Sequence, residues 1–313
     1  MATAESLISQ AAPVIEITGL RVRYGRRLAL DGLNARLTGR AVGLLGPNGA
    51  GKSTLIAALL GFIRPEAGSA RLWGESVDHP RPELRRLIGY MPENDAFVGN
   101  MSAVALTRLM GELSGLPPAA ALERAHECLF YVGLGEARYR ALSTFSQGMK
   151  QLAKLAQAIV HGPKLLILDE PTNSLDPEGR ERMLRLIRQM RDDAGMRIIL
   201  CSHLLRDVEQ TCDEVLILKQ GRAVHQAALG ADPAPSRLLE LETQGGDGDF
   251  AAALARLGCE VARRGRRLKL VLPAGVELRA VYQLAAQGQV QLRRVQFQRD
   301  TLEDIFLRAM EEV

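Results

Sequence analysis

The sequence predicts an α/β protein built on a parallel sheet, followed by a smaller α+β domain. Residues 164–171 and 196–203 form short, largely apolar runs, which are typical of strands buried on both faces of a parallel sheet. Segments with helical spacing alternate with such runs, as they do in α/β proteins. Beyond residue 229 the order of predicted elements becomes β, α, β, β, α, β, which indicates a ferredoxin-like module.

Length and composition fit this organisation. The chain has 313 residues, which favours one main domain and one small additional domain. Its 47% of hydrophobic and 24% of charged residues are typical of a folded protein. The formal charge, 40 − 36 = +4, is too small to indicate a nucleic-acid partner. Four cysteines without paired spacing argue against a disulfide framework or a zinc ribbon and fit a reducing compartment: Cys128, Cys201, Cys212 and Cys259.

The sequence gives no sign of a membrane-spanning or secretory segment. No run approaches about eighteen apolar residues, so we expect no spanning helix. The first residues have no basic segment before an apolar core, so we expect no secretory signal. A function at a membrane would therefore need another chain that crosses it.

The N-terminal elements lead into a glycine-rich loop. Residues 14–24 alternate between apolar and polar and predict a strand, and residues 27–37 predict a second strand, interrupted at Asp31-Gly32. The apolar run 41–46 predicts a buried strand, and residues 52–62 have helical spacing. This order of strand, loop and helix is the context that a phosphate-binding loop requires.

The middle of the chain has a different character. Residues from about 94 to 162 are rich in Ala, Leu and charged side chains and predict a helical subdomain, with a break at Leu116-Pro117-Pro118. A helix is expected at 178–194, and a hairpin at 214–224 that turns at Gln220-Gly221.

A domain boundary follows the hairpin. Residues 229–236, rich in Gly, Ala and Pro, predict a linker between a first domain at 14–228 and a C-terminal domain at 237–313. The last helix is expected to have Thr301 as its N-cap. The arginine-rich run 263–267 falls at a predicted hairpin turn, where it is either a solvated turn or a patch that binds phosphate or lipid headgroups.

The glycine-rich loop matches the phosphate-binding pattern GxxxxGK[ST]. Glycines allow the backbone to fold around phosphate oxygens, and the N-terminus of the following helix attracts the negative charge. In this pattern Lys52 contacts the β- and γ-phosphates of ATP and Ser53 binds Mg²⁺. The alternative is a glycine-rich turn that binds nothing. The residues of the motif are Gly46, Pro47, Asn48, Gly49, Ala50, Gly51, Lys52, Ser53 and Thr54.

A second candidate site lies at the end of the apolar strand 165–168. The strand ends in two carboxylates, of which Asp169 is expected to hold Mg²⁺ through water and Glu170 to polarise the attacking water. Adjacent residues at a strand end point in different directions, so the two carboxylates can have separate roles. The alternative is a pair of solvated acids at a strand end.

These motifs resemble those of the ATP-binding subunit of ABC transporters, over about residues 14–225. The segment specific to that family is the signature LSGGQ, which FSQGM at 145–149 resembles. In family members it opens a helix whose N-terminus faces the γ-phosphate held by the partner subunit. The resemblance assigns this contact in trans to the following residues, of which the second and fourth depart from the commonest form: Ser146, Gln147, Gly148 and Met149. Taken alone, Ser146 could be a simple N-cap.

Further positions are assigned by the same resemblance. Tyr24 corresponds to the aromatic residue that stacks on adenine, although a lone Tyr at a strand end is usually part of a core. His203 corresponds to the switch histidine that contacts the γ-phosphate and holds Glu170 and the water. Ser174 and Asp176 lie in the segment corresponding to the D-loop, and Asp176 could also be a helix N-cap.

The Q-loop of the family is represented by IGYMPE at 88–93, where Glu93 replaces the usual Gln. A carboxylate can bind Mg²⁺, so the expected metal ligands are Ser53, Glu93 and Asp169. This replacement, together with the C-terminal segment that begins at Thr301, resembles drug- and antibiotic-exporter members of the family.

The resemblance implies a P-loop NTPase fold, with an ABC-type ATPase core, a helical subdomain and the C-terminal module. It also implies an ATP-hydrolysing subunit, with ATP and Mg²⁺ as cofactors, that forms a head-to-tail homodimer or pseudo-dimer. A separate multispanning permease would hold it at the inner face of the cell membrane, in the cytoplasm. The alternatives are a soluble ABC-type ATPase that acts on nucleic acid, ribosomes or protein complexes, and a scaffold that binds ATP without hydrolysis.

Overall fold

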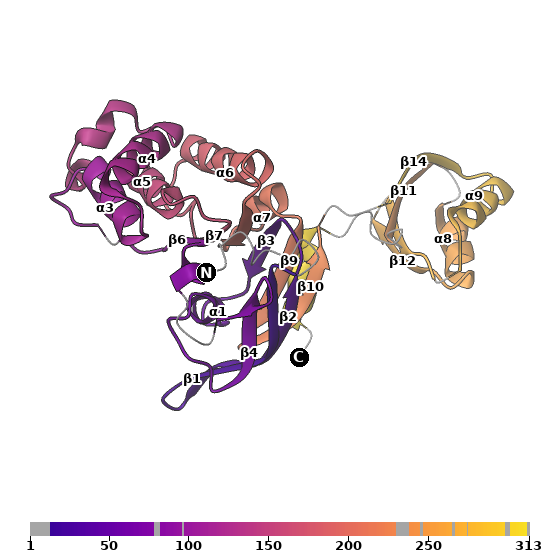
Figure 1. The fold of residues 1–313 in the computed structure, drawn as a ribbon. Coiled ribbons are helices and arrows are strands. Elements are labelled where there is room, and N and C mark those ends of the chain that lie inside the picture. Colours follow the sequence, from indigo (N-terminus) through magenta and orange to yellow (C-terminus); the bar gives the residue numbers. More distant parts are fainter. Residues whose placement is uncertain are drawn as a thin grey trace. The chain divides into compact units, whose positions relative to one another are not determined.

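The structure is a computed structural model (Figure 1). It describes residues 13–77, 82–95, 97–229, 238–244, 247–264, 267–273, 275–297 and 301–311. The chain divides into two compact units, Met1–Leu229 and Gly230–Val313. Residues 230–236 of the predicted linker lie outside the described residues, so the limits of the linker stay a prediction.

The first unit contains a six-stranded sheet with the order β10-β9-β3-β8-β7-β6. Its strands are β3 (Ala41–Leu45), β6 (Ile88–Met91), β7 (Leu165–Asp169), β8 (Arg197–Cys201), β9 (Glu214–Lys219) and β10 (Arg222–Ala228). Five strands run parallel, and β10 returns antiparallel to β9 as the predicted hairpin. Every residue of β3 and β7 is buried, which confirms the parallel sheet expected from their apolar runs.

A second, antiparallel sheet of the first unit has the order β2-β1-β4-β5. Its strands are β1 (Ile15–Tyr24), β2 (Arg27–Leu37), β4 (Ala67–Leu72) and β5 (Glu75–Ser76). The pairing of β1 with β2 shifts register where the sequence predicted an interruption near Gly32. Apolar side chains from both sheets and from α1 (Lys52–Leu59) join in one hydrophobic core, which fixes the start of α1 against the sheets.

The helices predicted between the two halves of the sheet are present. They are α3 (Ala103–Leu113), α4 (Pro118–Tyr131) and α5 (Gln147–Ile159), and Figure 1 shows them gathered at one end of the unit. The chain turns from α3 to α4 at the predicted break, where Pro118 opens the second helix. Two short 3-10 segments, Gly135–Tyr139 and Leu142–Thr144, lead into α5.

The remaining helices of the first unit are α2 (Pro82–Arg85), α6 (Pro177–Asp192) and α7 (Leu205–Thr211). The helix expected at 178–194 is α6, and Asp176 is its N-cap, because its Oδ1 atom accepts a hydrogen bond from the amide of Gly179 at 2.9 Å. The predictions did not include α2, α7, β4, β5 or β6.

The second unit has the elements β11 (Leu238–Gln244), α8 (Asp247–Arg256), β12 (Glu260–Arg264), β13 (Arg267–Val271), α9 (Leu278–Gln287), β14 (Gln291–Phe297) and α10 (Leu302–Glu311). Its sheet is antiparallel with the order β12-β13-β11-β14. This order and connectivity are those of a ferredoxin-like module, as predicted. The unit has its own core, to which Leu241, Phe250 and Leu268 contribute.

The last helix has the predicted cap. The Thr301 Oγ1 atom accepts a hydrogen bond from the Asp304 amide at 3.2 Å, and the Thr301 amide donates to Asp304 Oδ2 at 3.1 Å. This reciprocal pair is a capping box. Residues 265 and 266 of the arginine-rich turn between β12 and β13 lie outside the described residues, so both interpretations of that turn stay open.

Candidate functional site

The glycine-rich loop connects β3 to α1 and depends on its glycines. Gly46, Gly49 and Gly51 have φ angles of 147°, 81° and 108°, in the region that favours glycine. A Cβ atom at Gly46 would lie 2.3 Å from the carbonyl oxygen of Leu218, and one at Gly51 would lie 2.9 Å from that of Ala29. The loop can therefore keep this shape only with glycine at these positions.

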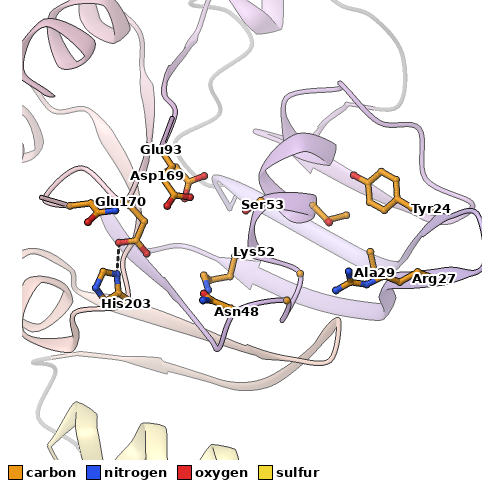
Figure 2. Close-up of a pocket in the computed structure, with 14 residues that line it drawn as sticks. Tyr24, Arg27, Ala29, Asn48, Lys52, Ser53, Glu93, Asp169, Glu170 and His203 are labelled. Carbon is orange, nitrogen blue, oxygen red and sulfur yellow. Dashed lines mark hydrogen bonds and ion pairs between the residues drawn. The ribbon is translucent and has the colours of Figure 1, made fainter. Parts of the chain in front are cut away.

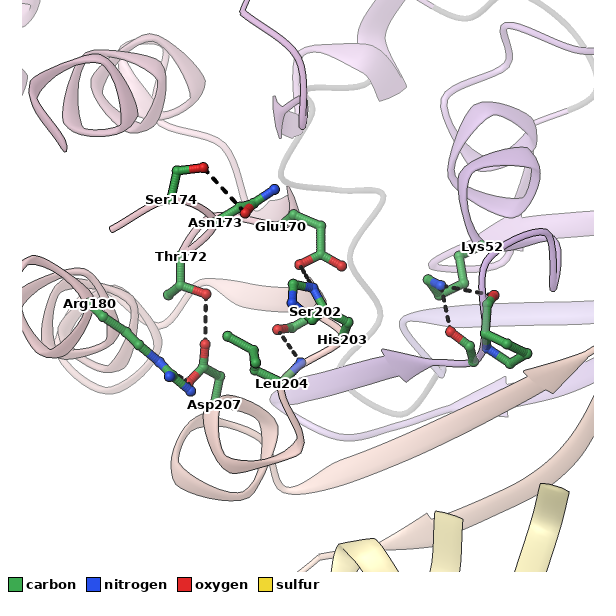
Figure 3. Close-up of polar contacts among 12 residues, drawn as sticks. Lys52, Glu170, Thr172, Asn173, Ser174, Arg180, Ser202, His203, Leu204 and Asp207 are labelled. Atoms are coloured by element: carbon green, nitrogen blue, oxygen red, sulfur yellow. Dashed lines mark hydrogen bonds and ion pairs between the residues drawn. The ribbon is translucent and has the colours of Figure 1, made fainter. Parts of the chain in front are cut away.

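Lys52 is the first residue of α1, and its side chain folds back over the loop. Its Nζ atom donates hydrogen bonds to the carbonyl oxygens of Gly46, at 2.6 Å, and Pro47, at 3.3 Å (Figure 3). Ala50 is buried, and its carbonyl accepts a hydrogen bond from the amide of Gly221 at 2.9 Å. Three of the predicted residues, Gly46, Pro47 and Ala50, thus shape the loop and position the ammonium group.

The loop forms one wall of a cavity with a volume of about 630 Å³. This volume lies in the range of small-molecule and cofactor sites. The residues that line it are Tyr24, Arg27, Ala29, Asn48, Gly49, Gly51, Lys52, Ser53, Thr54, Glu93, Asp169, Glu170, Asn173 and His203. The fold therefore brings together residues that the sequence analysis predicted separately, from five segments of the chain.

Figure 2 shows how the labelled side chains are distributed along the cavity. Tyr24 and Arg27 lie at one end, Glu170 and His203 lie at the other, and Lys52 lies between them. The Tyr24 residue is 49% exposed, so it is not a core residue. Its ring is available for stacking on a planar ligand, whereas the far end offers carboxylates and an imidazole ring.

Two buried carboxylates follow β7. Asp169 is its last residue, and Glu170 follows with a φ angle of 51°, a left-handed conformation that is uncommon outside glycine. Burial raises the pKa of Asp169, and the nearby Glu93 carboxylate raises it further. Burial also raises the pKa of Glu170, against the lowering effect of its hydrogen bond with His203. Both acids face the cavity, so they are not solvated side chains at a strand end.

His203 follows β8 and reaches across to Glu170. Its Nδ1 atom lies 2.8 Å from Glu170 Oε2, which is hydrogen-bond distance (Figures 2 and 3). The His203 side chain is 57% exposed, whereas that of Glu170 is 10% exposed. The imidazole ring therefore contacts both the buried acid and the open cavity.

Two lining residues, Arg27 and Ala29, were missing from the sequence analysis, and Asn173 was expected only as part of the segment 173–176 that corresponds to the D-loop. Arg27 pairs with Tyr24 across the β1–β2 turn, so pairing the two expected strands with each other would have placed both residues at one edge. Ala29 follows on the same strand. Asn173 lies one turn after Glu170, its amide donates to the Glu170 carbonyl at 3.1 Å, and its own carbonyl accepts from Gln151 Nε2 at 3.2 Å.

The signature and D-loop residues lie outside this cavity. Ser146 is the N-cap of α5, and its Oγ atom accepts a hydrogen bond from the Met149 amide at 3.3 Å. Ser146 and Gln147 are exposed, as are Ser174 and Asp176. Ser146 and Asp176 are therefore both helix N-caps. A contact of these segments with a second copy stays a prediction.

Comparison with known proteins identifies relatives along most of the chain. The family described as "ABC transporter" matches residues 30–173. An ABC transporter ATP-binding protein of Bacillus subtilis, YxlF, is 44% identical over 181 residues, which are 58% of this chain and 59% of that protein. The linearmycin resistance ATP-binding protein LnrL of the same organism is 31% identical over 307 residues, covering 94% of this chain and 97% of that protein.

The chain belongs to the family of ABC transporter ATP-binding proteins.

Another ABC transporter relative is the daunorubicin/doxorubicin resistance ATP-binding protein DrrA of Streptomyces peucetius. It is 37% identical over 227 residues, which are 71% of this chain and 67% of that protein. Because the chain described here is an ABC ATPase, it binds ATP and hydrolyses it. The relatives favour a role in transport over a soluble ABC-type ATPase without a transport function.

The ABC ATPase fold is also supported by solved structures. The dimeric cassette MJ0796 bound to ADP and phosphate has a TM-score of 0.63 at 20% identity, and the match covers 69% of this chain and 99% of that one. The expected P-loop NTPase fold is thus confirmed. In the part of the chain that the structure describes, no helix combines the length and the apolar character needed to cross a bilayer.

Proposed function

We propose that this protein is the motor subunit of an ABC exporter and that the cavity next to Lys52 is its ATP site. The observation that carries the proposal is the convergence of the phosphate-binding loop, two buried acids and His203 on one cavity. The similarity to LnrL and DrrA, both named as resistance proteins, supports export of an antibiotic-like compound.

The nucleotide would lie along the cavity, with its base at the Tyr24 end. The exposed ring of Tyr24 offers a stacking surface, and base–aromatic stacking contributes about 1–3 kcal/mol. The amide groups of the loop and of the first turn of α1 would bind the phosphates, because a helix N-terminus attracts anions. The Lys52 ammonium would then exchange its carbonyl partners for phosphate oxygens.

Mg²⁺ fits the oxygen atoms that line the centre of the cavity. The Ser53 hydroxyl and the Glu93 and Asp169 carboxylates are hard ligands of the kind that Mg²⁺ prefers. Both carboxylates line the same cavity, and Glu93 raises the pKa of Asp169. Among the described residues no group of three His, Cys, Asp or Glu side chains could hold a metal alone, so phosphate oxygens would complete the site. The bound ion would neutralise phosphate charge during hydrolysis.

Glu170 is the proposed general base. Its Oε2 atom is engaged by His203, which leaves Oε1 to accept a proton from the attacking water. An ionised carboxylate can only accept hydrogen bonds, so Nδ1 of His203 carries the proton in this pair. The imidazole, which also lines the cavity, thereby keeps the carboxylate oriented toward the phosphates.

The complete site is proposed to form between two copies packed head to tail. Ser146, Gln147, Gly148 and Met149 lie at the exposed N-terminus of α5, where amide groups and the helix dipole can bind the γ-phosphate held by the other copy. The cassette MJ0796, which has the same fold, is dimeric with bound ADP and phosphate, and this supports the formation of a dimer. A separate multispanning permease would receive the movement and hold the dimer at the cytoplasmic face of the membrane.

The dimer can be tested with the full chain carrying Glu170→Gln. In Mg²⁺ and ATP we expect this variant to sediment as a dimer and to return to the monomer when ATP is removed. The matched variant adds Ser146→Asp, which preserves the N-cap but places a negative charge against the phosphate. It should bind ATP and remain monomeric. Dimers that form equally well with Ser146→Asp would refute the contact in trans.

The transport role needs a second experiment. Membranes that contain this chain should release it together with a multispanning protein, and that partner should raise its rate of phosphate release. Recovery of the chain with ribosomes or nucleic acid, and without a membrane protein, would favour the soluble alternative instead.

A further inference from the structure

Lys154 is a buried charged residue in the middle of α5. Only 3% of its side chain is exposed. Its Nζ atom donates hydrogen bonds to the carbonyl oxygens of Pro92, at 2.9 Å, and Glu93, at 2.8 Å. The same ammonium lies 3.5 Å from Asp95 Oδ1. Lysine is almost never fully buried unless its charge is paired, so this position has a specific role.

Lys154 binds the backbone of Glu93 and not the Glu93 carboxylate. The two hydrogen bonds are to main-chain oxygens, whereas Glu93 lines the ATP cavity together with Asp169. Burial lowers the pKa of Lys154, and the charges of Asp95, Glu93 and Asp169 act in the opposite direction. The ammonium is therefore within electrostatic reach of the cavity but does not neutralise Glu93 by a direct ion pair.

One helix carries both the signature residues and this lysine. Ser146 caps the N-terminus of α5, and Lys154 follows two turns later on the same rigid element. If α5 tilts when its N-terminus binds a phosphate, Lys154 would transmit the movement to the backbone of Pro92 and Glu93 through its two hydrogen bonds.

We propose that Lys154 is a positioning residue that holds the Glu93 carboxylate at the Mg²⁺ site and ties it to the helix of the signature motif. This inference rests on the proposed function, because it takes Glu93 as a ligand of the metal. The residue touches neither nucleotide nor metal. Outer partners orient metal ligands, and Lys154 does so through the backbone of the segment after β6.

The test compares the full chain with its Lys154→Met variant, which keeps an unbranched apolar stem about as long as that of lysine and removes the ammonium donor. The readout is the affinity for a non-hydrolysable ATP analogue by calorimetry, with Mg²⁺ and with excess chelator. We expect the gain in affinity that Mg²⁺ provides to be about tenfold smaller in the variant. This is the lower end of the loss in metal affinity that follows removal of an outer partner. Binding in chelator should stay at the parental value.

The direction in which the Mg²⁺-dependent affinity changes distinguishes a misplaced Glu93 carboxylate from the loss of the lysine charge. Removing a cation near Asp169 would by itself strengthen the binding of Mg²⁺, since it leaves more negative charge around the metal. A weaker metal effect can therefore come only from lost geometry. The proposal is wrong if Mg²⁺ raises the affinity of Lys154→Met for the ATP analogue as much as it raises that of the parent, or more.

Lys150→Met is the matched control. Lys150 lies one turn earlier on α5 and its Nζ atom is 3.4 Å from Oδ2 of the same Asp95, so the variant removes the same charge from the same acid. We expect it to keep the parental metal effect, and an equal loss would contradict the assignment. Lys154→Gln, whose side chain is shorter, provides a polar variant if Lys154→Met does not fold. A parental chain without any metal effect would instead refute the proposed Mg²⁺ site.

Discussion

The Nδ1 atom of His203 lies 2.8 Å from Glu170 Oε2, although the two residues are 33 positions apart in the chain. The register of the sheet creates this contact. Asp169 at the end of β7 pairs with Cys201 at the end of the parallel strand β8, and the amide of Glu170 donates to the Cys201 carbonyl at 2.8 Å. Parallel strands end at the same edge of a sheet, so the next residues of both strands meet there.

Replacing Glu170 with Gln is expected to lower ATP turnover by about 10²–10⁴, the usual effect of losing a general base. The amide is similar in size but cannot take the proton from water. Nucleotide affinity should remain close to the parental value, because the loop and Lys52 are unchanged. Phosphate release and calorimetry on the same preparation measure the two effects. Turnover at the parental rate would show that Glu170 is not the base.

His203→Ala should also lower turnover, by less than the loss caused by Glu170→Gln, because in this site the imidazole acts largely through the carboxylate that it holds. The decisive measurement is the double variant. Residues that act as a unit have non-additive effects, so His203→Ala should cost little more in the Glu170→Gln background. Independent, multiplied losses would mean that His203 has a separate role.

Lys52→Ala is expected to weaken ATP binding by about 10- to 100-fold, because a hydrogen bond to a charged group contributes about 1.5–3 kcal/mol. The variant also leaves the carbonyls of Gly46 and Pro47 without the lysine donor. Calorimetric titration measures the affinity. Lys164→Ala, at an exposed position before β7, is the control and should bind ATP like the parent. Equal affinities of the two variants would exclude this loop as the phosphate site.

The sequence predicts well what depends on neighbouring residues. The loop at 46–54 needs only local glycines and a strand before a helix, and β7 needs only an apolar run, so both were predicted correctly. In contrast, β4 (AGSARL) has few β-formers and is a strand through its pairing with β1, which is distant in sequence. Its partner β5 pairs with it locally but has only two residues, Glu75 and Ser76, and neither is a residue enriched in strands.

The site shows the same division between local and distant information. From the sequence alone, Arg27 is an ordinary solvated arginine at the start of a strand. The pairing of β1 with β2 places it in the cavity beside Tyr24. Lys154 reads as one charged residue on a helix, and its burial follows from how α5 packs against the segment after β6. Ser146 is predicted to contact a phosphate that another copy of the chain holds. The structure of one chain can therefore show only that Ser146 is an exposed N-cap.

An ion pair behind the site, between the partly exposed Arg180 and a buried carboxylate, provides a prediction about stability. Asp207 is fully buried, and it accepts hydrogen bonds from Thr172 Oγ1 at 2.6 Å and from Arg180 Nε at 2.7 Å (Figure 3). Thr172 lies between Glu170 and the D-loop, so this pair joins α6 and α7 to the segment that carries the base. Arg180→Ala would leave the carboxylate buried without its cation, which typically costs about 3–5 kcal/mol.

Urea unfolding of the full chain measures this loss, with Arg188→Ala as the control on the same helix. Arg188 pairs with the exposed Glu181 at 2.9 Å, and exposed pairs contribute at most about 1 kcal/mol. The midpoint of the first unit should therefore fall clearly for Arg180→Ala and hardly at all for Arg188→Ala. Because Asp207 supports the segment of Glu170 through Thr172, Arg180→Ala should also lower turnover in the protein that remains folded. Equal midpoints for the two variants would mean that water enters and solvates Asp207 when its arginine is removed.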